Sequence, residues 1–99
     1  MRTLSGAIDA QMERLSSMTD VIYVHVDLSI LSAAEMPDLP ASRHDRLSSD
    51  ELAAFLNEVF AFPKATAVGI AGLPNDADEI SIRAAYGLIE GAIGGVRNR

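Results

Sequence analysis

The feature that most constrains the fold is a β-favouring run at residues 21–28, which reads Val-Ile-Tyr-Val-His-Val-Asp-Leu. Because successive side chains of a strand point to opposite faces, one face of this run carries only aliphatic side chains and the other carries Tyr23, His25 and Asp27. A strand that is apolar over most of its length is typical of a parallel sheet covered by helices on both faces. A second short apolar run, at residues 65–71, predicts a second buried strand.

Three other segments have the apolar spacing of helices, at residues 4–16, 49–62 and 81–96. The second of them has the clearest start signal, because Ser48 and Glu51 form a capping box. In the third, the spacing predicts one apolar face made of Ile82, Ala85, Tyr86, Ile89, Ile93 and Val96. Glycines in this segment cost helix stability, so we expect them to permit close backbone packing or to fray the end of the helix.

The predicted order of elements is α-β-α-β-α, within a single α/β unit over residues 1–99. A strand, a helix and a second strand in succession form a right-handed crossover, so the two strands are expected to be parallel. Residues 29–47 contain Pro37 and Pro40 and no helical period, which predicts a long loop. The fold class is therefore α/β, with two parallel strands and three helices.

A sheet of two parallel strands leaves unpaired backbone groups along both outer edges and is marginally stable alone. A chain of 99 residues also buries a modest share of its surface, so a partner would add to its stability. We therefore expect the sheet to be completed by pairing, either with a second copy in a homo-oligomer or with another chain.

Composition narrows the classes of function. The net charge of −6 argues against nucleic acid and anionic membranes as partners, because both require a basic surface. The absence of cysteine excludes disulfides, thiolate metal sites and thiol catalysis. The sequence contains neither a run long enough for a membrane span nor the apolar core of a signal peptide, so a cytoplasmic location is expected.

Chemistry in an open α/β sheet gathers beyond the carboxyl ends of the strands. Asp27 stands at such an end, and it either caps the following loop, pairs with an arginine or ligates a metal ion. His25 lies on the same face and either adds a nitrogen ligand or is a buried, hydrogen-bonded histidine, which is the commoner role. Three further acids, Asp76, Asp78 and Glu79, lack the spacing of a calcium loop and are expected to favour the start of the last helix.

Residues 22–31 (Ile-Tyr-Val-His-Val-Asp-Leu-Ser-Ile-Leu) resemble the strand and turn of the arginase, agmatinase and formiminoglutamase family. That family's pattern is an aliphatic strand followed by Asp-x-Asp, a hydrophobic pair and Asp-Pro. The similarity continues through the helix after Leu47 and through residues 68–71 and 84–91, and it covers nearly this whole chain but only the C-terminal portion of the family's fold. The resemblance implies a Rossmann-like parallel sheet and a site with two Mn²⁺ ions, which activates water to attack a guanidinium or related carbon.

The chain departs from the family pattern at the residues that carry the chemistry. Asp27 matches the first acid of the pair, but Ser29 stands at the second position, and Ser32-Ala33 replaces the Asp-Pro. A glutamate that many members carry near the end of the next strand falls on Ala71. The family's two other ligand motifs, which lie in its N-terminal half, have no counterpart in these 99 residues.

Two hypotheses follow. In the first, the chain is a truncated or degenerate manganese-dependent ureohydrolase that is inactive alone, with Asp27 and His25 as candidate metal ligands and no catalytic residue of its own. A partner chain would then supply the missing ligands. In the second, it is a non-catalytic oligomerisation or interaction module that uses the open sheet edges. Affinity for Mn²⁺ separates the two hypotheses, and the sequence leaves open whether the chain takes part in hydrolysis.

Overall fold

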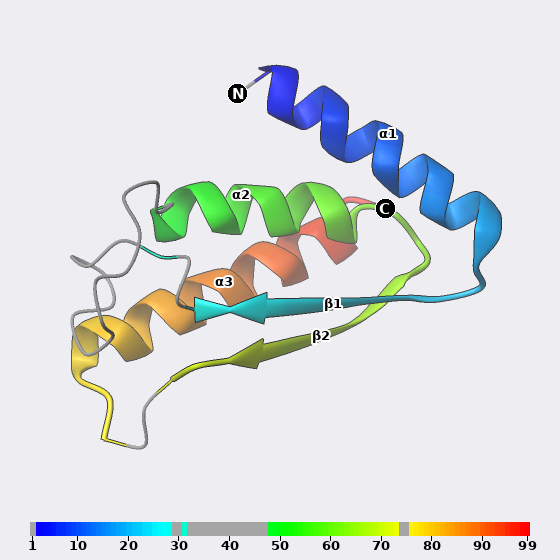
Figure 1. Cartoon of the computed structure of the whole chain (residues 1–99). Coiled ribbons are helices and arrows are strands. Elements are labelled where there is room, and N and C mark those ends of the chain that lie inside the picture. The colour runs from blue at the N-terminus through cyan, green and yellow to red at the C-terminus, as the bar shows by residue number, and fades with distance from the viewer. Residues whose placement is uncertain (1, 29–30, 32–47, 74–75) are drawn as a thin grey trace.

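The computed structural model describes residues 2–28, 31, 48–73 and 76–99. Its elements are α1 (Arg2–Met18), β1 (Ile22–Asp27), α2 (Ser49–Phe60), β2 (Ala65–Ala71) and α3 (Glu79–Arg97). This order and the parallel pairing of the two strands confirm the predicted α/β class (Figure 1). Both outer helices are longer than the spacing predicted, whereas α2 ends two residues earlier. Apart from Leu31, the predicted loop at 29–47 lies outside the described residues.

The two strands pair in register from Tyr23 opposite Ala67 to Asp27 opposite Ala71, after an irregularity next to Ile22. Helices α2 and α3 lie on one side of this sheet, and α1 lies beyond α2 (Figure 1). Burial follows the pleat, because Ile22 and Val26 are buried while the intervening side chains of β1 that face the other way are exposed. The prediction that helices cover both faces is therefore wrong for the described part of the chain, which covers one face.

Helix α2 begins as the sequence predicts. The Ser48 hydroxyl accepts a hydrogen bond from the Glu51 backbone N–H at 3.1 Å, and the Glu51 carboxylate accepts one from the Ser48 backbone N–H at 3.0 Å. Two N–H groups that lack a partner within the helix are thereby satisfied. The buried face of the helix consists of Leu52, Leu56, Val59 and Phe60.

Helices α2 and α3 run parallel and are in very close contact. A methyl group placed on Gly91 would lie 2.5 Å from the carbonyl oxygen of Ala53, and one on Gly95 would lie 2.3 Å from that of Asn57. Gly91 follows Ala53 by the same number of residues as Gly95 follows Asn57, so the two helices advance by equal numbers of residues along this contact. The expectation that glycines of the last helix permit close backbone packing is confirmed at these two positions.

The buried face of α3 is not the apolar face that the spacing predicts. Buried against α2 and the sheet are mostly small residues, namely Ser81, Ala84, Leu88, Ala92 and Gly95. Five of the six residues of the predicted apolar face are exposed: Ile82, Tyr86, Ile89, Ile93 and Val96. The larger apolar side chains are exposed because close approach to α2 requires small side chains at the contact, and that requirement outweighs the preference for burying the larger ones.

Two basic side chains connect the elements at the end of the molecule where both strands begin. Lys64 donates hydrogen bonds to the backbone oxygens of Ser16 and Thr19, the latter at 2.8 Å, at the C-terminal end of α1. Arg99 donates to the backbone oxygen of Phe60 at 2.9 Å and to that of Ala65. Cations near the last carbonyls of a helix complement the negative end of its dipole. Among the described residues, no helix is both long and apolar enough to cross a bilayer.

Candidate functional site

The candidate site lies where the two strands end. Asp27 is the last residue of β1 and pairs with Ala71, the last residue of β2. In a parallel pair, residues opposite each other present their side chains on the same face. The structure therefore brings together the two positions that the family resemblance equates with an acid and a glutamate. One of them carries a carboxylate, and the other carries a methyl group, with both exposed.

Gly72 shapes the floor of this site. Its φ of +96° lies in the left-handed region, which only glycine occupies without strain. A Cβ atom at this position would lie 3.1 Å from Oδ1 of Asp27 and 3.5 Å from the backbone nitrogen of Leu28. The Asp27 carboxylate therefore lies close to the backbone at Gly72, and it can do so because this position has no side chain.

His25 lies two residues before Asp27 on the same face and is exposed. The interpretation of His25 as a buried histidine is therefore wrong, because the face that carries it is the one that the described helices leave uncovered. Its ring centroid lies 6.4 Å from that of Tyr23, at an interplanar angle of 39°. The Tyr23 ring in turn lies over Gly69, where a Cβ atom would meet the phenol oxygen.

The described residues do not fit a two-metal site. No group of three or more His, Cys, Asp or Glu side chains within them is arranged to hold a metal ion. Asp27 and His25 can offer one carboxylate and one imidazole, whereas manganese prefers several oxygen ligands. Ser29, at the second position of the acid pair, lies outside the described residues. A complete ligand set therefore requires groups beyond those described.

The acidic turn before α3 has a structural role. Asp78 is the N-cap of α3, and its carboxylate accepts a hydrogen bond from the backbone N–H of Ser81 at 2.8 Å. Glu79 pairs with Arg83 one turn later at 2.7 Å, with both side chains largely exposed. The expectation that the acids of this turn favour the start of the last helix is thereby confirmed for Asp78 and Glu79.

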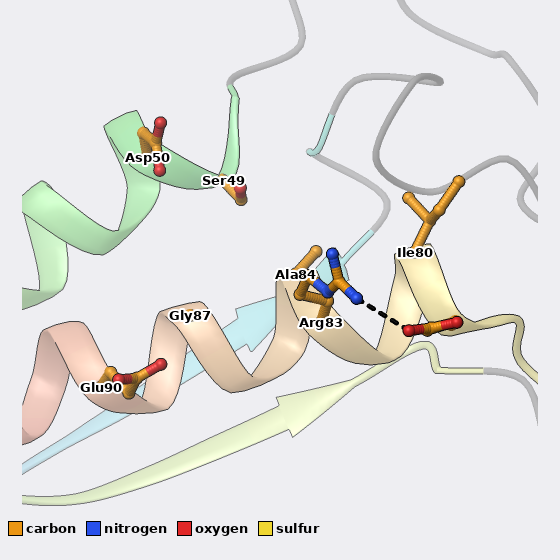
Figure 2. Close-up of a pocket in the computed structure, with 8 residues that line it drawn as sticks. Ser49, Asp50, Ile80, Arg83, Ala84, Gly87 and Glu90 are labelled. Carbon is orange, nitrogen blue, oxygen red and sulfur yellow. Dashed lines mark hydrogen bonds and ion pairs between the residues drawn. The ribbon is translucent and has the colours of Figure 1, made fainter.

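A polar groove that sequence reasoning missed lies between the start of α2 and the first half of α3 (Figure 2). Its volume is about 520 Å³, and its charged lining residues are Asp50, Glu79, Arg83 and Glu90. Figure 2 shows Asp50 and Glu90 well apart on different helices, while Arg83 is occupied by its ion pair. The groove therefore has no convergent set of polar atoms. The one signal for it in the sequence is Gly87, whose Cβ position has nothing within 4 Å.

Comparison with known proteins defines the class of fold. No family model and no curated protein sequence matches this chain. Among solved structures, formimidoylglutamase from Bacillus subtilis is similar at a TM-score of 0.81 and 24% identity, over 92% of this chain and 29% of that chain. Agmatine ureohydrolase of Thermoplasma volcanium is similar at a TM-score of 0.68 and 17% identity, over 92% of this chain and 31% of that chain.

The chain therefore has an α/β fold found in arginase-type ureohydrolases, as the resemblance of its strand and turn predicts. It spans less than a third of the length of either structure. At these identities the similarity defines the fold, and the chemistry has to be argued from the site itself.

Proposed function

We propose that this chain is a degenerate ureohydrolase-type unit that does not hydrolyse substrate on its own. The observation that carries the proposal is the pairing of Asp27 with Ala71 at the carboxyl ends of the two strands. Ala71, the position beside the remaining carboxylate, offers no polar side-chain atom to a cation or to the guanidinium of a substrate. An arginase-type site binds and activates water between two cations, and that requires several carboxylates.

The proposal includes Mn²⁺ as the metal of the complete site, with Asp27 as its ligand in this chain and His25 as a second candidate. The remaining ligands would come from another chain or from another part of a longer product, in the cytoplasm. The fold similarity supports this proposal, because it covers less than a third of each ureohydrolase. A further chain or segment would join at the sheet face that the described helices leave uncovered, and at the outer edges of the two strands.

The test is a calorimetric titration of the purified chain with Mn²⁺, followed by assays for hydrolysis of agmatine and of formiminoglutamate. We expect at most weak binding, which Asp27→Ala abolishes, and no release of urea or formamide. Ser17→Ala, on exposed α1, is the control for loss of binding through unfolding. Hydrolysis by the isolated chain that disappears in Asp27→Ala would overturn the proposal.

A second candidate function is a non-catalytic interaction module, and the exposed apolar residues of α3 favour it. If the chain binds no Mn²⁺ at all and Asp27→Ala leaves its stability and association unchanged, the module is the better description. If Asp27→Ala abolishes a measurable affinity for Mn²⁺, the chain is better described as a ureohydrolase-type unit.

A further inference from the structure

The outward face of α3 carries a continuous apolar stripe, defined here as Ile82, Tyr86, Ile89, Ile93 and Val96. These side chains are between 39% and 63% exposed. They lie on a different side of the helix from Ala84, Leu88 and Gly95, which are buried. The stripe is therefore not part of the core that the described residues form.

The spacing within the stripe indicates what covers it. Successive members are separated by four, three, four and three residues. This is the a/d pattern of a heptad repeat, in which apolar residues recur every 3.5 residues on average. A seam with this period matches another helix that crosses at a small angle, because the two helices remain in contact over several turns. A sheet has no such period, so the seam favours a helix as the occupant.

The charges beside the seam favour a second copy of α3. One flank of the stripe carries Arg83, Glu90 and Arg97, all exposed and at the same heptad position. In an antiparallel pair of heptad helices, residues at this position lie opposite each other. When Ile82 packs against Ile93 of the second copy, and Tyr86 against Ile89 of the second copy, Arg83 lies opposite Glu90 of the second copy. Symmetry repeats the ion pair, so two attractive pairs flank the seam.

The other arrangements lack this complementarity. Shifting the antiparallel pair by one heptad brings Arg83 opposite Arg97 and places the two copies of Glu90 opposite each other, which is repulsive. In a parallel pair, Glu90 and Arg97 face Ala85 and Ala92, which carry no charge, and Arg83 faces Asp78, whose carboxylate already accepts the Ser81 N–H as the N-cap. Like charges across a helix pair are destabilising, so the pattern selects one register and one orientation.

We propose that this chain forms a two-fold symmetric dimer through α3, with the two helices antiparallel and the Arg83–Glu90 pairs on the flank of the apolar seam. A symmetric interface of this kind uses the same surface of both copies, as a two-fold axis requires. Glu79 already pairs with Arg83 at 2.7 Å, so the guanidinium in the dimer bridges two carboxylates. The dimer does not depend on the proposed function, because it involves neither Asp27 nor a metal.

The test uses sedimentation velocity on the full chain over a range of concentrations, with two charge reversals. Arg83→Glu and Glu90→Arg each place like charges opposite one another twice, so each variant alone should have a dissociation constant about ten-fold or more above that of the native dimer. An equimolar mixture of the two variants restores both attractive pairs and should form a heterodimer of near-native affinity. Glu13→Arg reverses an exposed charge on α1, away from the seam, and should leave the affinity unchanged.

Ile89→Asp should abolish the dimer without unfolding the chain, because Ile89 is 40% exposed. Circular dichroism of each variant separates a lost interface from a lost fold. A native chain that remains monomeric at a concentration of about 100 μM, at which even weak dimers are populated, would overturn the proposal. A dimer whose dissociation constant is unchanged by all these substitutions would also overturn the proposal, since its interface would lie elsewhere, for example at the sheet edges.

Discussion

Gly91 of α3 lies directly on the backbone of Ala53 of α2, so closely that an added methyl group would come within 2.5 Å of the Ala53 carbonyl oxygen. The obstacle is backbone, which cannot rotate away as a flexible side chain can. The separation of α2 and α3 is therefore determined by the absence of a side chain at Gly91. Leu88 and the buried residues around it are packed at the separation that this contact permits.

The contact predicts that Gly91→Ala destabilises the chain although alanine is the better helix former. The helical gain is about 1 kcal/mol, and forcing a methyl group into a packed contact costs about 1–3 kcal/mol or more. Because the obstacle is backbone, we expect a packing cost toward the upper end of this range and a net loss of up to about 2 kcal/mol in urea denaturation. Gly87→Ala is the matched control, because nothing lies within 4 Å of its Cβ position and only the helical gain remains. Equal effects of the two substitutions would contradict this account.

Gly72→Ala is expected to destabilise the chain for two separable reasons. Its φ of +96° disfavours any residue with a side chain by about 1–2 kcal/mol. The new methyl group would also contact the Asp27 carboxylate at 3.1 Å. Asp27→Ala removes the second contribution, so the double variant should lose less stability than the sum of the single changes. Strict additivity in the urea midpoints would show that the contact has no effect.

Ser81→Ala is expected to stabilise the chain by about 1 kcal/mol, since an unpaired buried hydroxyl carries a desolvation cost. The Ser81 side chain is fully buried, and its hydroxyl finds no hydrogen-bond partner within the described part of the chain. The hydrogen bond from its backbone N–H to Asp78 is unaffected by the substitution. A lower melting temperature for Ser81→Ala would mean that the hydroxyl has a partner in solution.

Arg99→Ala should lower stability by about 1–2 kcal/mol, because a charged donor to two backbone oxygens is lost. These oxygens belong to Phe60, at the end of α2, and Ala65, at the start of β2. Arg97→Ala, also exposed on the last turn, is the control and should change the melting temperature little. If the two alanine variants have the same melting temperature, the Arg99 hydrogen bonds do not contribute to stability in solution.

The capping box gives α2 a defined pH dependence. The pKa of Glu51 is lowered from its ordinary 4.5, chiefly by the hydrogen bond from the Ser48 backbone N–H and then by that with the Ser48 side chain. A carboxyl group with a lower pKa when folded stabilises the protein above its unfolded pKa, and this contribution is lost as the pH falls through the folded pKa. The melting temperatures of native chain and Glu51→Gln should therefore differ at pH 7 and converge below about pH 4.5. A difference that persists unchanged at pH 3 would contradict the assignment.

Local features of the sequence determined much of the fold. The Ser48–Glu51 capping box and the alternation along residues 22–27 act through neighbouring residues, so they can be identified without the tertiary structure. The parallel pairing of the strands follows from the handedness of a strand–helix–strand crossover. The family resemblance likewise depends on a local run, and the fold similarity confirms the architecture that it implies.

Only the tertiary structure decided which apolar residues of α3 are buried. Periodicity identifies Ile82, Ile89 and Ile93 as one face, but it contains no information on how closely another helix approaches. The contact of Gly91 with Ala53 is a distance between segments far apart in the sequence, and it selects the small side chains for burial. The same holds at the site, where strand register placed Ala71 beside Asp27. Packing between distant segments is decided by shape and volume, which a pattern along one chain does not encode.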